Sequence, residues 1–152
     1  MFQGSIPALI TPFKNGNIDY ESFYKIIEWS LSEGSHGFVP CGTTGESPTL
    51  SHQEHIKVVD ECVRIVDKRV PVIAGTGSNN TIEAIEFTQH AEKSGANGAV
   101  VVTPYYNKPT QEGLFLHFSS IAESTKIPII IYNIPGRSIV DMTIDTMSVL
   151  SN

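Results

Sequence analysis

The sequence is poor in several features, and each shortage excludes a class of protein. Only two cysteines occur among the 152 residues, Cys41 and Cys62, and they form neither a CxxC pair nor a metal-binding spacing. A disulfide framework is therefore not expected. We predict two reduced thiols in the interior, where free cysteines are usually found.

Long hydrophobic runs and runs of one charge are also missing. The longest apolar stretches, such as 127–131, are far shorter than the ~20 residues that cross a bilayer, and the first residues do not resemble a signal peptide. The formal net charge is −6, with acidic and basic residues spread along the chain. We expect a cytoplasmic protein that binds neither nucleic acid nor a membrane.

The glycine-rich phosphate-binding motifs of nucleotide-binding α/β folds are absent as well. The sequence has no GxxxxGK[ST], no GxGxxG follows the first apolar run, and "GTGSNN" at 75–80 lacks the third glycine of that motif. No cofactor is expected.

What the chain does contain is one pattern repeated every ~30 residues, the length of a βαβ unit. A β-branched apolar run is followed by turn residues and then by a stretch with helical periodicity. The pattern predicts strands at 5–11, 37–41, 70–74, 99–103 and 128–132, helices at 20–32, 52–66, 81–93 and 111–124, and a further helix that starts at Thr143.

Capping residues mark the starts of these helices. Asp19 is a plausible N-cap of the first helix. Ser51 and Glu54 form a capping box before the second helix, and Asn80 and Glu83 stand in the same relation before the third. The third helix is expected to stop before Gly95.

The predicted strands indicate a parallel α/β fold. They are nearly continuous apolar runs, as expected when a sheet is covered or closes into a barrel. Polar clusters follow every strand ("TPF", "GTTGES", "GTGSNN", "TPYYN" and "YNIPGR"), which is typical of a (βα)8 TIM barrel. Since such a barrel usually needs ~250 residues, residues 1–152 are expected to form about five βα units, the N-terminal part of one barrel domain.

Several side chains after the strands have catalytic chemistry. Thr43 and Thr44 either satisfy backbone groups of their turn or face the barrel mouth, where they could bind a carboxylate and pass a proton. Tyr132 ends the fifth strand, where a phenol can serve as acid or base. Arg137 is either a solvated surface residue or a clamp for a carboxylate.

Two further pairs of residues, two tyrosines and two histidines, can be explained by structural roles alone. Tyr105 and Tyr106 could simply be buried aromatic anchors. His52 and His55 lie one helical turn apart, but no third ligand is in sight and Glu54 is better explained as a cap. No metal site is expected.

The segments "GFVPCGTTGE", "TPYYNKP" and "YNIPGRS", in this order and spacing, resemble the dihydrodipicolinate synthase/N-acetylneuraminate lyase family of class I aldolases. The resemblance covers essentially the whole chain from "FQGSIPALITPF" onward. It implies a (βα)8 barrel in a homotetramer built from tight dimers. It also implies a lyase that condenses pyruvate with L-aspartate 4-semialdehyde through a Schiff base, on the path to lysine and diaminopimelate.

The resemblance also implies roles for individual residues. Thr43 would belong to a proton relay with Tyr132 and Tyr106, and Tyr106 would reach across the tight dimer into the neighbouring site. Thr44 would help to bind the pyruvate carboxylate. Arg137 would hold the carboxylate of the aldehyde substrate at the entrance.

Many members of the family are inhibited by L-lysine at the dimer interface. Pro48 occupies a position in that region where smaller residues are common. The positions that match the family's lysine site are Ser47, His52, His55, Asn79, Glu83 and Tyr105.

The departure from the family concerns the nucleophile, a lysine in an "IKE"-like segment on the sixth strand. No lysine of this chain lies inside an apolar strand near its C-terminal end, where burial could lower its pKa. Family spacing places that lysine beyond Asn152, so the chain alone is predicted to be inactive. Two alternatives remain: a sibling pyruvate aldolase such as N-acetylneuraminate lyase, and a non-catalytic lysine-binding half-barrel that pairs with another chain.

Overall fold

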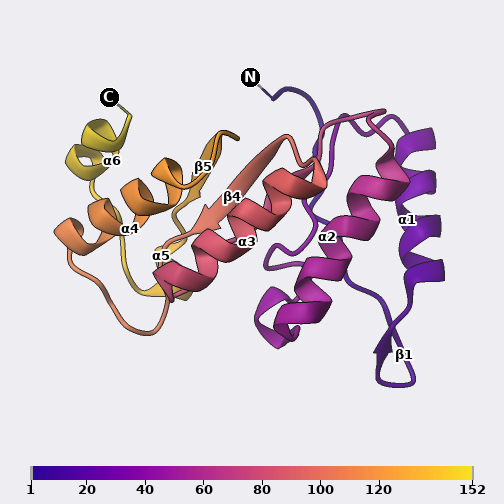
Figure 1. Cartoon of the computed structure of the whole chain (residues 1–152), viewed down its shortest axis with the longest axis horizontal. Coiled ribbons are helices and arrows are strands. Elements are labelled where there is room, and N and C mark those ends of the chain that lie inside the picture. The colour runs from indigo at the N-terminus through magenta and orange to yellow at the C-terminus, as the bar shows by residue number, and fades with distance from the viewer. Residues whose placement is uncertain (1, 152) are drawn as a thin grey trace.

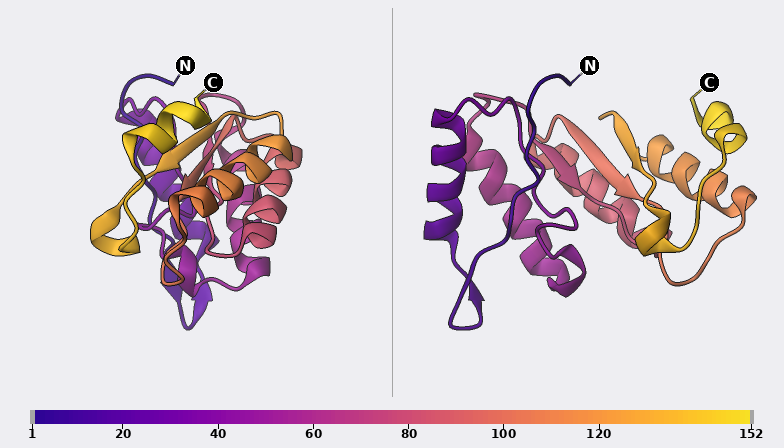
Figure 2. Two further views of the ribbon diagram at one scale, coloured as in Figure 1. Left: turned by 90° about the vertical axis from the view of Figure 1, so that its left-hand side faces the viewer. Right: turned by 180° about the vertical axis from the view of Figure 1, so that it is seen from behind.

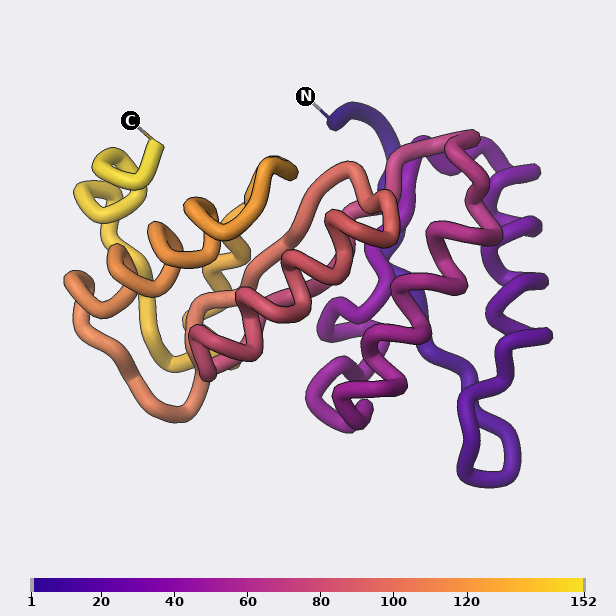
Figure 3. The backbone as a smooth tube through the Cα atoms, viewed as in Figure 1, coloured from indigo at the N-terminus to yellow at the C-terminus, as the bar shows by residue number. Residues whose placement is uncertain are grey.

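Five parallel strand segments follow one another in the chain and lie side by side in the same order. The computed structural model describes residues 2–151. Strands β3 (Ile73–Gly75), β4 (Gly98–Val102) and β5 (Ile129–Tyr132) form one parallel sheet in this order. The backbone trace in Figure 3 shows each βα unit next to the preceding one. The predicted class, a partial (βα)8 barrel with five βα units, is confirmed.

The first two strand segments join this sheet through isolated bridges. Ala8 pairs with Val39 and Phe38 pairs with Val72, both in parallel. The backbone N–H of Leu9 donates to the Val39 carbonyl at 2.9 Å. The predicted strands 5–11 and 37–41 are therefore extended and correctly placed, but each is reduced to short pairings.

Proline explains why these pairings are short. Pro7, Pro40 and Pro71 lie in the three neighbouring segments, and none of them has an N–H to donate. Their carbonyls are still used, because Val39 donates to Pro7 and Phe38 donates to Pro71, both at 3.0 Å. The third predicted strand, 70–74, begins later than expected for the same reason.

The helices agree with the predicted ones to within one residue. Each packs against its neighbour in sequence, and Figures 1 and 2 show α2, α3 and α4 on the same side of the sheet. None of the helices within residues 2–151 could span a membrane. The helices are α1 (Tyr20–Ser32), α2 (His52–Val66), α3 (Thr81–Ser94), α4 (Gln111–Glu123) and α6 (Ile144–Leu150).

Three short elements are additional to the prediction. A two-stranded hairpin, β1 (Phe13–Lys14) with β2 (Asn17–Ile18), precedes α1. A 3₁₀ turn, η1 (Ser47–Thr49), precedes α2, and the short helix α5 (Pro135–Ser138) follows β5. The last two lie in the loops at the C-terminal ends of strands, where the candidate site residues are found.

The predicted caps are present, with one correction. Asp19 caps α1 by accepting from the backbone N–H of Ser22 at 3.1 Å. Ser51 and Glu54 form the capping box of α2. Asn80 caps α3 by accepting from the N–H of Ile82 at 3.0 Å. The predicted Asn80–Glu83 box is wrong, because the Glu83 carboxylate accepts from the Ser78 hydroxyl at 2.5 Å instead.

The apolar interior consists of two clusters. One lies between α1, α2 and the first strands and includes Phe23 and Phe38, both fully buried. The other lies between the sheet, α3 and α4 and includes Leu114. Cys41 and Cys62 are buried free thiols, as predicted, and burial raises the pKa of Cys62 to about 12.

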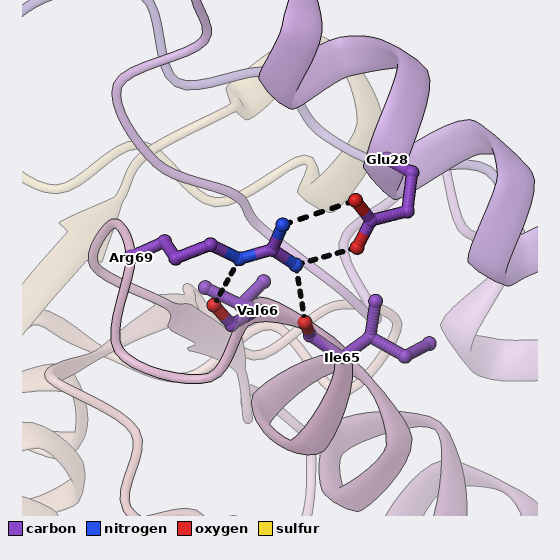
Figure 4. A network of polar contacts seen from close by, with 4 residues as sticks. All are labelled: Glu28, Ile65, Val66 and Arg69. Atoms are coloured by element: carbon purple, nitrogen blue, oxygen red, sulfur yellow. Dashed lines mark hydrogen bonds and ion pairs between the residues drawn. The ribbon is translucent and has the colours of Figure 1, made fainter.

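An arginine fastens α1 to α2 at the end of the strands opposite the candidate site. Two nitrogens of Arg69 donate to the Glu28 carboxylate on α1, one of them at 3.0 Å. The same guanidinium donates to the carbonyls of Val66 at 3.0 Å and Ile65 at 2.6 Å (Figure 4). It therefore satisfies carbonyls that the end of a helix leaves unpaired and ties two helices together through a bidentate contact.

Candidate active site

A small cavity lies where the strands end, and it brings together two predicted catalytic residues. Thr43 and Tyr132 both line this cavity, of about 30 Å³, although they are far apart in the sequence. Gly75 and Val100, from the two strands between them, also line it. Residues from four neighbouring βα units thus meet at one edge of the sheet, the edge where barrel enzymes place their chemistry.

The turn after the second strand segment is closed by its own backbone. The N–H of Gly45 donates to the Gly42 carbonyl at 3.0 Å, and the N–H of Glu46 donates to the Thr43 carbonyl at 3.1 Å. Within residues 2–151 the hydroxyls of Thr43 and Thr44 have no hydrogen-bond partner. The structural alternative raised by the sequence, that these hydroxyls satisfy the turn, is therefore not what the structure shows.

Thr11 serves the turn instead, and sequence reasoning missed it. Its buried hydroxyl donates to the Gly45 carbonyl at 2.7 Å and so ties the first strand segment to the turn. The available signal was its place in "TPF", directly after the first predicted strand. Because Thr11 anchors the turn, the two following threonine hydroxyls are available to another molecule.

A second, larger cavity of about 220 Å³ adjoins the first. Arg137 on α5 lines it together with Thr43, Tyr105 and Ile134. Arg137 makes no hydrogen bond or ion pair through its side chain within the described part of the chain. A guanidinium with unused donors at the edge of a cavity can bind a carboxylate through two parallel hydrogen bonds.

Two predicted residues lie apart from these cavities. The Tyr106 side chain is 87% exposed, and its backbone has a φ of +75°. Thr44 is also exposed and lines none of the cavities described. Within this one chain, the structure therefore brings Thr43 and Tyr132 together but leaves Tyr106 projecting outward.

A third cavity, of about 120 Å³, collects most of the positions that match the family's lysine site. The remaining one, Asn79, does not line the cavity but donates from its amide to the carbonyl of Tyr105, which does, at 3.2 Å. The five predicted residues that line it are Ser47, His52, His55, Glu83 and Tyr105.

Phe87 packs against both histidine rings of this third cavity, and the sequence analysis did not identify it. The His55 ring stacks on Phe87 with the ring centres 3.8 Å apart, and the His52 ring does so at 4.5 Å. Burial lowers the pKa of His55 to about 4, although the Gly75 backbone acts in the opposite direction. His55 is therefore a neutral ring near pH 7, and the Glu83 carboxylate is the acidic group of this cavity.

The three cavities share lining residues. Ser47 and Gly77 line all three cavities, and Pro48 lines the second and third. A β-carbon at Gly77 would lie 2.4 Å from the Val102 backbone nitrogen, so only glycine fits there. A ligand in one cavity would consequently contact residues that also border the others.

None of the lysines within residues 2–151 lines any of the three cavities. Lys25 pairs with Glu21 along α1, and the Lys57 ammonium lies 4.7 Å from the centre of the Tyr20 ring. The described residues also hold no group of three or more side chains suited to a metal ion.

The whole chain, residues 1–152, matches the Dihydrodipicolinate synthetase family. The chain belongs to this family. It is 68% identical over 152 residues to the 4-hydroxy-tetrahydrodipicolinate synthase of Rhizobium meliloti (strain 1021), covering 99% of this chain and 52% of that protein. This confirms the predicted resemblance, including the match to the N-terminal half of the family's enzymes.

Solved structures of family members superpose closely on the chain. The chloride-inhibited dihydrodipicolinate synthase of Acinetobacter baumannii, complexed with pyruvate, gives a TM-score of 0.97 at 50% identity and covers 100% of this chain and 53% of its own. The enzyme of Cyanidioschyzon merolae with lysine bound gives 0.95 at 40% identity, covering 99% and 52%. The chain thus spans about half the length of the relatives it matches.

Proposed function

We propose that the protein containing this chain is a class I aldolase-type lyase that condenses pyruvate with L-aspartate 4-semialdehyde, in lysine and diaminopimelate biosynthesis. The observation that supports it most strongly is the convergence of Thr43 and Tyr132, with unbonded hydroxyls, on one cavity at the strand ends. The attacking amine comes from outside residues 1–152, because no lysine of the described chain borders this cavity.

The chemistry requires proton transfers at a carbonyl. An amine adds to the pyruvate carbonyl, water leaves to give an imine, and loss of a methyl proton produces the enamine that attacks the aldehyde. Tyr132 supplies and removes these protons and exchanges them with Thr43. Tyr106 completes the relay from a neighbouring subunit, which is consistent with its 87% exposure.

The two substrates carry carboxylates, and the chain offers a donor for each. Thr44 contributes to binding the pyruvate carboxylate. Pyruvate as a ligand is supported by the Acinetobacter baumannii relative, whose structure is complexed with pyruvate. Arg137 binds the carboxylate of the aldehyde from the adjoining cavity. An unpaired guanidinium suits a small carboxylated aldehyde, which favours the synthase over a sialic-acid lyase.

L-lysine binds in the third cavity and inhibits the reaction. Its ammonium groups face Glu83 and the hydrogen-bonded pair of Asn79 and Tyr105. The stacked rings of His52 and His55 lie beside them. Lysine as a ligand is supported by the Cyanidioschyzon merolae relative, whose structure has lysine bound. Because Ser47 borders both this cavity and the catalytic one, lysine would contact the wall of the catalytic cavity directly.

The assembly and location follow from the same proposal. Tyr106 can reach a neighbouring site only in an oligomer, so the proposal requires at least a dimer. The family resemblance extends this to a dimer of tight dimers in the cytoplasm. Neither a nucleic acid nor a membrane is a partner, and the reaction needs no cofactor or metal.

The full-length protein that contains these residues tests this function. Pyruvate and L-aspartate 4-semialdehyde should both be consumed, and the product should be reducible in a coupled dihydrodipicolinate reductase assay. N-acetylneuraminate should not be cleaved. Cleavage of that sugar without condensation would favour the sibling aldolase, and neither activity would favour the non-catalytic half-barrel.

A further inference from the structure

The loop that presents Arg137 is held in a strained conformation. Ile139, directly after α5, has a φ of +67°, a left-handed conformation that a β-branched side chain adopts only at a cost in energy. Its side chain is 64% exposed, so apolar burial does not compensate for the strain. Other contacts must therefore fix this turn.

Ser138 makes those contacts. It is 1% exposed, although the residues on both sides of it are exposed. Its Oγ lies 3.0 Å from the carbonyl oxygen of Ile134, before the strained residue, and 3.0 Å from that of Val140, after it. One hydroxyl thus bridges the two sides of the turn.

The same hydroxyl joins the turn to the sheet. The Thr103 hydroxyl, fully buried just after β4, donates to Ser138 Oγ at 3.0 Å. A second hydrogen bond closes the loop on itself: the Asn133 amide, before α5, donates to the Asp141 carboxylate, after it, at 2.7 Å. The loop is therefore fixed to β4 and closed on itself, while the guanidinium one residue before Ser138 stays unpaired.

We propose that Ser138 is the positioning residue for Arg137. Its hydroxyl holds the strained turn against Thr103 so that the guanidinium lies at the edge of the cavity that Thr43 also lines. A fixed guanidinium presents both donors to a carboxylate without first being ordered, which strengthens binding. This inference rests on the proposed function, since it concerns how the carboxylated aldehyde is bound.

The test compares Ser138→Ala with Ser120→Ala in the full-length protein. Ser120 is a matched control, because its hydroxyl also bonds a carbonyl four residues earlier, that of Leu116 at 2.8 Å, but on the exposed side of α4. Ser138→Ala should raise KM for the aldehyde by about tenfold, as expected for a misplaced binding group, with a smaller change in kcat. KM for pyruvate should change less than about twofold in both variants.

Three further substitutions separate positioning from a general loss of structure. In an Ile139→Gly background the turn is no longer strained, so Ser138→Ala should raise the aldehyde KM by less than about threefold. Thr103→Val keeps the shape of the side chain and removes its donor, so it should raise the aldehyde KM in the same direction if Ser138→Ala fails to fold. Thr103→Ser should restore the wild-type value.

The outcomes are distinct. If the wild-type protein does not condense the two substrates, the proposed function fails and this inference fails with it. An active wild type whose aldehyde KM is unchanged in Ser138→Ala and Thr103→Val overturns this inference alone. Equal increases in the KM values of both substrates would also overturn it, because they would indicate a structural defect.

Discussion

The first cavity, which we propose to be catalytic, and the third, which we propose to bind lysine, both border Ser47. We call them the catalytic cavity and the lysine cavity, and their polar groups differ in how far they are already bonded. In the catalytic cavity the hydroxyls of Thr43 and Tyr132 have no partners within residues 2–151. In the lysine cavity the groups are already engaged: Glu83 accepts from Ser78, and His55 is stacked and buried. The groups that we propose to move protons are left free, whereas the groups that we propose to recognise lysine are fixed in advance.

The largest effect is expected on the catalytic side. Tyr132→Phe preserves the ring and removes only the phenolic proton, so kcat of the full-length protein should fall roughly 10²–10⁴-fold, the usual cost of losing an acid or base. Phe38→Leu, a buried change away from the cavities, is the control for general packing damage. A Tyr132→Phe enzyme within a few-fold of wild type would remove Tyr132 from the relay.

The next largest effect is expected on the pH dependence of the free energy of unfolding, through His55 in the lysine cavity. Burial holds the pKa of His55 at about 4 instead of 6.5, a difference that corresponds to about 3 kcal/mol. The unfolded chain binds this proton first as the pH falls, so the contribution is complete above pH 6.5 and is lost between pH 6.5 and 4.

Denaturant unfolding of the full-length protein at pH 7 and pH 4 measures this effect. His55→Phe keeps a neutral ring against Phe87 and should lose less stability on acidification than the wild type. An identical loss in both proteins would show that His55 does not titrate as its burial indicates.

Arg137→Lys tests whether the free guanidinium binds by two hydrogen bonds. A lysine keeps the charge but cannot form the fork. Losing one charged hydrogen bond should raise KM for the aldehyde roughly 30-fold in steady-state assays, with little change in KM for pyruvate. An unchanged aldehyde KM would mean that Arg137 is a solvated surface residue, the alternative that the sequence left open.

The smallest effect is expected at the edge of the lysine cavity. Glu83→Gln removes the charge and should raise the inhibition constant for L-lysine about tenfold. Glu86→Gln is the matched control, one turn further along α3, with its carboxylate 4.0 Å from His52 and outside the cavity lining. If millimolar lysine leaves the wild type fully active, the cavity is not a lysine site.

The sequence predicted the helices better than the strands, for a physical reason. The boundaries of α1 and α2 were predicted correctly because apolar periodicity and the caps at Asp19 and Ser51 are local signals. The first two strands shrank to bridges because Pro7 and Pro40 lack donors, and the effect of a missing donor depends on which neighbour it faces.

Part of the site could be read from the sequence. Polar residues after consecutive parallel strands meet at one edge, so the location of Thr43 and Tyr132 at the barrel mouth could be expected from the topology. Their pairing in a relay came from the family resemblance. The supporting contacts could not be read, because Thr11 with Gly45 and Thr103 with Ser138 join residues more than thirty positions apart. No periodicity or cap marks such contacts in a single sequence.

The central claim is that this chain supplies the proton relay and that the attacking amine lies elsewhere. Borohydride reduction of the full-length protein with pyruvate, followed by peptide mass mapping, tests it most directly. A single stoichiometric adduct should form on a lysine outside residues 1–152, and Tyr132→Phe should slow its formation. An adduct on any lysine between Lys14 and Lys126 would contradict the account.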